Sequence, residues 1–150
     1  MPGSFAALYH HFVFSTKHRV PTIDPQVRGR LYDYVGGLCR ARQCRLLAAG
    51  GTEDHVHLLV AMSRDLAVSD FARDIKANSS RWIHETFPDR QGFAWQEGYA
   101  AFTVSQSVLE TVRNYIERQG EHHQKRTFQE EFRELLRRHE IELDERYMWD

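Results

Sequence analysis

The chain has 150 residues, enough for one domain that buries about two thirds of its unfolded surface without disulfides or a structural metal. Its formal net charge of −1 excludes a strongly basic nucleic-acid protein, and its apolar stretches are shorter than the roughly 20 residues that cross a bilayer. Two cysteines and no signal-peptide pattern favour a reducing, cytoplasmic setting, and we expect no membrane partner.

Charge is uneven along the chain. Residues 129–150 hold eight acidic residues against four arginines, whereas the remainder holds 16 basic and 13 acidic residues. We therefore expect a single domain over residues 1–150 with an acidic C-terminal tail from about residue 129. The mildly basic body offers phosphate contacts, although the same charges also fit ordinary solvated surfaces.

The first half of the chain predicts a strand, a helix and a hairpin. Residues 9–16 are aromatic and β-branched, which is typical of a strand. Asp24 and Pro25 resemble an N-cap and first helical residue, and apolar residues then recur at helical spacing to about residue 43.

Two further strands are predicted over residues 44–49 and 53–62. Gly50-Gly51 lies between them and favours a tight turn. These two strands are therefore expected to pair as a hairpin.

The second half predicts three more helices and a strand. Residues 65–87 show mixed three- and four-residue apolar spacing, and the aromatic segment 92–104 is expected to end in a fourth strand. Ser107 to Glu110 matches a capping box, after which Leu109, Val112 and Ile116 form one helical stripe. A short amphipathic helix follows from Thr127.

A β-α-β-β-α-β order predicts an α+β fold, specifically a ferredoxin-like or RRM-like antiparallel sheet with its helices on one face. Such a sheet leaves its other face free. We expect that face to carry the chemistry.

His55, Val56 and His57 stand at the start of an apolar run that predicts a buried strand. Side chains alternate along a strand, so both imidazoles leave the same face. Neutral imidazole is the commonest protein ligand for transition-series divalent ions, and the pair favours a metal site. The same pattern also arises from two hydrogen-bonded core histidines.

Tyr115 and Gln119 are four residues apart in the predicted helix that follows the fourth strand. They therefore share a face at the border of its apolar stripe. The amide oxygen of Gln119 can complete a His-His-Gln ligand set. Phenol is a poor nucleophile at neutral pH, and a nearby divalent metal supplies the cation that favours its ionisation.

Taken together, these segments resemble the single-tyrosine HUH transposases of the smallest bacterial insertion sequences, of the IS-two-hundred type. The resemblance covers nearly the whole chain. It is carried by residues 9–19, 54–60, 93–105, 115–119 and 121–123.

The resemblance implies roles for four residues. His55, His57 and Gln119 would hold Mg²⁺ or Mn²⁺, and Tyr115 would attack a phosphodiester of single-stranded DNA to give a 5′-phosphotyrosine intermediate and a free 3′-OH. It also implies a dimeric transposase that recognises DNA hairpins at the element's ends. Since each step exchanges one phosphate ester for another, no nucleotide cofactor is expected.

Other residues are weaker candidates. Asp54 could orient a histidine by a hydrogen bond without binding the metal itself, although its position also suits an ordinary turn residue. The candidates for DNA contacts are Lys17, Arg19, Lys76, Arg81 and Trp95, of which the tryptophan would stack on an unpaired base.

Two other functions remain open. A domesticated regulator would bind DNA hairpins without cutting them, and a related HUH nickase would share the chemistry. The presence of all four predicted active-site residues disfavours the first, and the short chain disfavours the second because such nickases usually carry extra domains.

Overall fold

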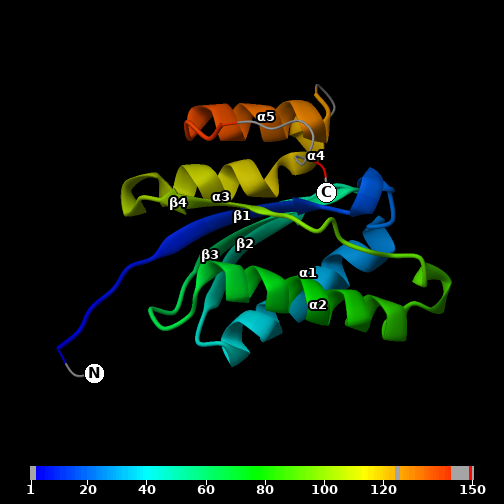
Figure 1. The fold of residues 1–150 in the computed structure, drawn as a ribbon, viewed down its shortest axis with the longest axis horizontal. Helices are drawn as coiled ribbons and strands as arrows, with labels where there is room; N and C mark the ends of the chain where they lie inside the picture. The colour runs from blue at the N-terminus through cyan, green and yellow to red at the C-terminus, as the bar shows by residue number, and fades with distance from the viewer. Residues whose placement is uncertain (1–2, 124–125, 143–148, 150) are drawn as a thin grey trace.

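The computed structural model describes residues 3–123, 126–142 and 149. Four strands form one antiparallel sheet in the order β2-β3-β1-β4, which confirms the predicted α+β fold (Figure 1). The strands are β1 (Tyr9–Ser15), β2 (Arg45–Gly51), β3 (His55–Ala61) and β4 (Ala100–Val104). The helices are α1 (Pro25–Ala41), α2 (Val68–Thr86), α3 (Leu109–Glu117), α4 (Gln119–His122) and α5 (Phe128–Arg138), with 3-10 turns η1 (Lys17–Arg19), η2 (Pro88–Arg90) and η3 (Gln106–Val108).

The two longest helices, α1 and α2, cover one face of the sheet (Figure 1). Asp24 caps α1 by accepting a hydrogen bond from the backbone N–H of Val27, and Pro25 occupies the first turn, as predicted. Alternate residues of β1 and β3 point into this layer, among them Phe12, Phe14 and Leu58. This layer holds the largest apolar core.

The second face of the sheet is also covered, by α3, α4 and α5 (Figure 1). The prediction that helices lie on one face is wrong in this respect. The apolar stripe predicted for α3 packs Ile116 against Leu59 and Ala48 on the second face, because both longer helices already occupy the first. The face that is expected to carry the chemistry is therefore covered by helices rather than open.

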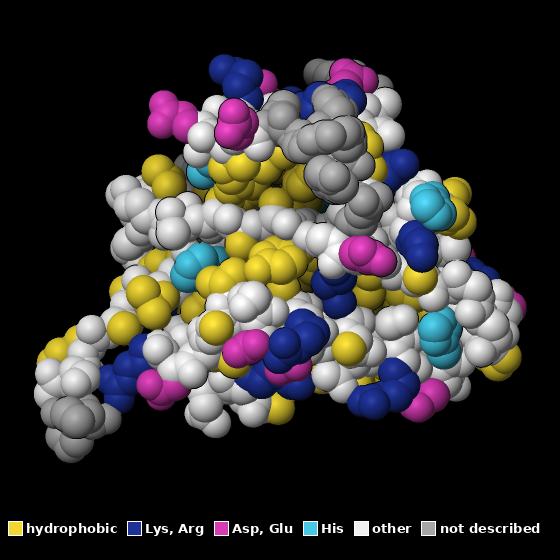
Figure 2. Space-filling model, viewed as in Figure 1, with side chains coloured by type: hydrophobic (Ala, Val, Ile, Leu, Met, Phe, Trp, Pro, Cys, Tyr) yellow, Lys and Arg dark blue, Asp and Glu magenta, His cyan; other side chains and the backbone are white. Residues whose placement is uncertain are grey.

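The predicted acidic tail begins as a packed helix. Thr127 and Glu130 form a capping box at the start of α5, and four of its apolar side chains are buried against β1 and β4. Figure 2 shows hydrophobic side chains gathered beneath α5, with basic and acidic side chains interspersed around the visible face. The buried side chains of α5 are Phe128, Glu131, Phe132, Leu135 and Leu136.

Gly50 and Gly51 do not form the predicted turn. Both lie in β2, where Gly50 pairs with His57, and the chain reverses over residues 52–54 instead. A Cβ atom at Gly50 would stand 1.9 Å from the carbonyl oxygen of Ile116. The missing side chain therefore lets α3 approach the sheet closely, beside His57.

Candidate active site

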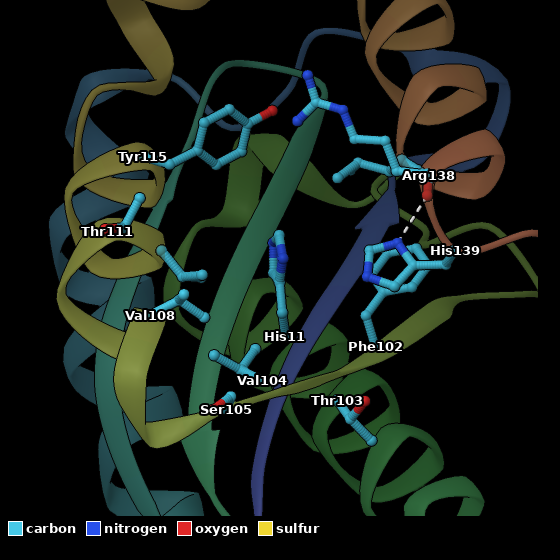
Figure 3. Close-up of a pocket in the computed structure, with 12 residues that line it drawn as sticks. His11, Phe102, Thr103, Val104, Ser105, Val108, Thr111, Tyr115, Arg138 and His139 are labelled. Atoms are coloured by element: carbon cyan, nitrogen blue, oxygen red, sulfur yellow. Dashed lines mark hydrogen bonds between the residues drawn. The ribbon is translucent and has the colours of Figure 1, made fainter.

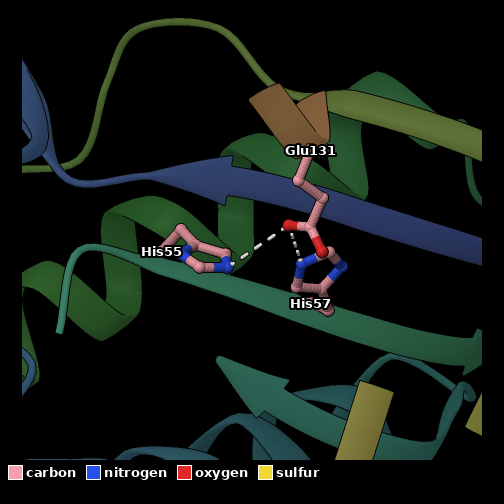
Figure 4. A group of neighbouring side chains, drawn as sticks. All are labelled: His55, His57 and Glu131. Atoms are coloured by element: carbon pink, nitrogen blue, oxygen red, sulfur yellow. Dashed lines mark hydrogen bonds and ion pairs between the residues drawn. The ribbon is translucent and has the colours of Figure 1, made fainter. Parts of the chain in front are cut away.

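His55 and His57 project from β3 toward the roof formed by α3, α4 and α5, and both side chains are fully buried. Figure 4 shows them side by side on the strand, facing the carboxylate of Glu131, which descends from α5. The period-2 alternation of the strand accounts for their common direction.

His57 is held between two partners. Its Nδ1 lies 2.8 Å from Nε2 of His11 on the neighbouring strand β1, and its Nε2 lies 2.9 Å from Oε1 of Glu131. Burial lowers the pKa of His57 to about 4, so the ring is neutral. The tautomer that satisfies both contacts has Nε2–H donating to Glu131 and Nδ1 accepting from His11.

His55 is oriented by the loop that precedes it. Its Nδ1 lies 2.8 Å from Oδ1 of Asp54, a carboxylate that also accepts a hydrogen bond from Thr52. Burial raises the pKa of Asp54, but the hydrogen bond and charge of His55, together with the hydrogen bond from Thr52 and the charge of His123, lower the pKa overall. An ionised Asp54 accepts the Nδ1–H, and the tautomer with its proton on Nδ1 directs the Nε2 lone pair of His55 into the site.

The side chain of Gln119 also reaches the cluster. The prediction that one continuous helix carries both Tyr115 and Gln119 is wrong. α3 ends at Glu117, and Gln119 begins the short helix α4. Its Oε1 lies 3.0 Å from Nε2 of His55 and 3.0 Å from Nε2 of His123. The amide oxygen therefore sits between two imidazoles.

Glu131 is the site residue that sequence reasoning missed. Its carboxylate is fully buried, with Oε1 2.9 Å from His57 Nε2, 3.1 Å from His123 Nε2 and 3.5 Å from His55 Nε2. Burial raises its pKa, but hydrogen bonds from His123 and His57 more than offset this and hold the pKa well below its usual range. One signal was available: Glu131 lies three residues after Phe128 and four before Leu135, on the apolar stripe of α5.

Tyr115 completes the group from α3. Its hydroxyl donates to Oε2 of Glu131, and its ring lies edge-on to His57 with 5.8 Å between centroids. Burial, followed by the negative charge of Glu131, raises the pKa of Tyr115. The phenol is therefore protonated at neutral pH, and its proton already has an acceptor.

The donor set fits a divalent cation. The ligand atoms of His55, His57 and Glu131 all lie within 4.8 Å of one another. The Nε2 lone pair of His55 faces two further acceptors, Oε1 of Gln119 and Oε1 of Glu131, with no proton between them when His55 is neutral. A bound cation would relieve this convergence of acceptors, and imidazole nitrogen with carboxylate and amide oxygen is a donor set that divalent metals accept.

The candidates for DNA contacts lie outside this cluster. Lys17 and Arg19 lie in η1, directly after β1, whereas Lys76 and Arg81 lie on α2, on the opposite side of the sheet. Lys76 donates to the backbone carbonyls of residues 97 and 98.

Trp95 belongs to the apolar core. It is 8 % exposed, packs against Phe14 and Phe93, and donates its indole N–H to Ser79. The expectation that Trp95 stacks on an unpaired base therefore needs correction, since its ring is not presented to solvent.

Within the described part of the chain, no helix combines the length and apolar character needed to span a membrane. Residues 4–119 match the family described as "Transposase IS200 like". The match ends before α5, so Glu131 lies outside the matched segment.

Individual relatives agree with this match. The chain is 26 % identical over 122 residues to the ISDra2 transposase TnpA of Deinococcus radiodurans, an alignment that covers 78 % of this chain and 87 % of the relative. It is 29 % identical over 117 residues to the transposase for insertion sequence element IS200 of Salmonella typhimurium, with 75 % and 76 % covered.

Two solved structures share the fold. A crystal structure of a transposase from Deinococcus radiodurans superimposes with a TM-score of 0.66 at 27 % identity, covering 79 % of this chain and 95 % of the other. The structure of a REP-associated tyrosine transposase bound to a REP hairpin superimposes with a TM-score of 0.57 at 14 % identity, covering 77 % and 68 %. The second likeness concerns the fold alone.

Proposed function

Because the chain belongs to the family of IS200-like transposases, we propose that it cuts and rejoins single-stranded DNA at insertion-sequence ends with Tyr115 as nucleophile. The observation that carries the proposal is the convergence of the Tyr115 hydroxyl, His55, His57 and Gln119 on one buried point. A phenol beside a cluster of metal-type ligands matches the needs of a phosphodiester transfer.

In this proposal His55, His57 and Gln119, together with Glu131, hold Mg²⁺ or Mn²⁺. The bound cation would polarise the scissile phosphate and stabilise charge on its oxygens. His57 would have to present an unprotonated Nε2 to bind, so both rings would change tautomer: His57 would carry its proton on Nδ1 and donate it to Nε2 of His11, which would carry its own proton on Nδ1. Asp54 keeps His55 in the matching tautomer through Nδ1.

Tyr115 then exchanges one ester for another. Its Oη forms a bond to phosphorus while the bond from phosphorus to the 3′ oxygen breaks, which gives a 5′-phosphotyrosine and a 3′-OH. The phenolic proton passes to Oε2 of Glu131 and from there, through water, to the departing 3′ oxygen, so the step gains and loses no net proton. Attack by a 3′-OH on the phosphotyrosine reverses the step and joins new ends, so no nucleotide cofactor is consumed.

The proposed partners are single-stranded DNA with hairpin ends and a second copy of this chain. A neighbour in fold was solved with a REP hairpin, which supports a hairpin ligand. Lys17 and Arg19, beside the end of β1, remain candidates for phosphate contacts, and Lys76 and Arg81 would contact DNA that passes the α2 side. The proposed compartment is the cytoplasm, where the DNA lies.

Covalent adduct formation tests the proposal. The protein is incubated with Mn²⁺ and 3′-labelled single-stranded DNA that spans the sequences flanking its gene, and products are resolved on a denaturing gel. We expect a labelled protein band that disappears in Tyr115→Phe. The control variant Tyr34→Phe should retain the band, because Tyr34 stacks on Trp82 on the α1–α2 side and the substitution keeps its ring. An adduct that survives Tyr115→Phe, or a preference for duplex DNA, contradicts the assignment.

A further inference from the structure

A cavity of about 280 Å³ opens beside the nucleophile, between β4, α3 and α5. Figure 3 shows Tyr115 on its α3 side and Arg138 and His139 on its α5 side, with His11 below. The proposed transesterification uses the hydroxyl of Tyr115 but leaves this space without a role.

The walls of the cavity are flat and mostly apolar. Phe102 stacks on the ring of His139 with 4.1 Å between centroids, and Val104, Val112 and Leu135 line the space around them. Flipped or unpaired bases are held between aromatic and apolar side chains of this kind. The volume is close to the lower limit of small-molecule sites, which suits one flat heterocycle rather than a larger group.

The rim carries a cation. The Arg138 side chain is 63 % exposed and pairs with Glu134 through Nε at 3.0 Å. An exposed guanidinium at the mouth of an apolar pocket suits an anionic ligand with an apolar end, such as a nucleotide whose base enters and whose phosphate stays outside.

The place of the cavity next to Tyr115 indicates which nucleotide of a bound strand would enter it. The Tyr115 ring forms one wall, so the base on the sugar next to a phosphate placed at its hydroxyl lies within reach of the cavity. Resting on the function proposed above, we propose that this cavity binds the nucleobase immediately flanking the scissile phosphate. Residues from α5 complete the pocket, and α5 lies outside the segment that matches the family.

Filling the cavity tests this inference. Val108 and Thr111 line the pocket from exposed positions, so Val108→Trp and Thr111→Trp are expected to fold, which thermal melting verifies. Gln26→Trp, at an exposed position of α1 on the other side of the sheet, is the matched control. Each variant is also made in a Tyr115→Phe background that binds DNA without cleaving it.

The probe is the single-stranded oligonucleotide cleaved by the wild-type protein, with 2-aminopurine or an abasic residue placed on either side of the mapped cleavage point. One of the two 2-aminopurine positions should be quenched on binding to Tyr115→Phe, and Val108→Trp and Thr111→Trp should remove the quenching. An abasic residue at that position should weaken binding about tenfold in the Tyr115→Phe protein but have no further effect when the cavity is filled.

Several outcomes overturn the inference while leaving the proposed function intact. In each of them the wild-type protein still forms an adduct with the intact DNA. The inference fails if 2-aminopurine is quenched at neither position, or if the quenching survives both tryptophan variants. It also fails if an abasic residue weakens DNA binding equally in proteins with a filled and an unfilled cavity. Failure of the proposed function is read separately, as the absence of a Tyr115-dependent adduct on the intact strand.

Discussion

The two faces of the sheet use the same strands for different purposes. On β3, Leu58 enters the core beneath α1 and α2, while its neighbours His55 and His57 enter a polar cluster beneath α3 to α5. Both environments are buried, but one consists of hydrocarbon and the other of imidazole, amide and carboxylate. The comparison teaches that stability can be concentrated on one face, which leaves the other able to hold buried polar groups whose arrangement serves a ligand.

The largest effects are expected when two neighbouring residues of β3, one facing each side of the sheet, are replaced by alanine in turn. His57→Ala removes a proposed ligand and leaves the buried carboxylate of Glu131 without one of its donors, so adduct formation is expected to fall to the background of Tyr115→Phe. Leu58→Ala is expected to cost about 2–5 kcal/mol of stability through an apolar cavity. It should still give an adduct below its melting temperature. Gel assays and thermal melts measure both effects, and the division fails if Leu58→Ala abolishes the adduct in a folded protein.

Glu131→Gln tests whether the polar face is built for a cation. The amide keeps the size of the side chain but removes the charge that faces His57, His123 and Tyr115, so Mn²⁺ affinity should fall about 10- to 100-fold. Free Mn²⁺ measured by electron paramagnetic resonance gives the affinity without reference to DNA cleavage.

Glu117→Gln is the matched control, because it makes the same change at an exposed position at the end of α3. If Glu131→Gln binds Mn²⁺ as tightly as this control, Glu131 does not belong to the ligand set.

Gly50→Ala probes how closely the roof must approach the sheet. The new Cβ would meet the carbonyl oxygen of Ile116, so α3 must shift and carry Tyr115 away from His57. Overpacking of this kind costs about 1–3 kcal/mol, and we expect a lower melting temperature and about tenfold slower adduct formation.

Gly29→Ala on α1 provides the control, since nothing lies within 4 Å of its added Cβ and alanine favours the helix. Equal adduct rates for the two alanine variants would show that the approach of α3 at Gly50 has no bearing on the chemistry.

The parts of the site that could be predicted from the sequence are those that follow from local periodicity. Strand alternation placed His55 and His57 on one face, and a four-residue spacing placed Tyr115 near Gln119 even though the helix breaks at Arg118. The pattern of α5 marks Glu131 only as an acidic residue on an apolar stripe; its contact with His57 spans 74 residues, and no local pattern reports such a contact. Gly50 was misread for a related reason: glycine signals a turn locally, whereas here it serves the distant α3.

The smallest effect is expected from Asp54→Asn, at the edge of the polar face. The amide keeps the side chain's size but weakens the acceptor for Nδ1–H of His55, so the Nε2 lone pair is less firmly directed into the site. Mn²⁺ affinity should fall about tenfold at most, less than for Glu131→Gln, because the donors themselves remain. Glu53→Gln is the control. The carboxylate of Glu53 is exposed, and within the described part of the chain its one ion pair is with Arg28, at 3.5 Å. A loss in Asp54→Asn that matches or exceeds that of Glu131→Gln would instead make the loop before β3, rather than α5, the dominant support of the site.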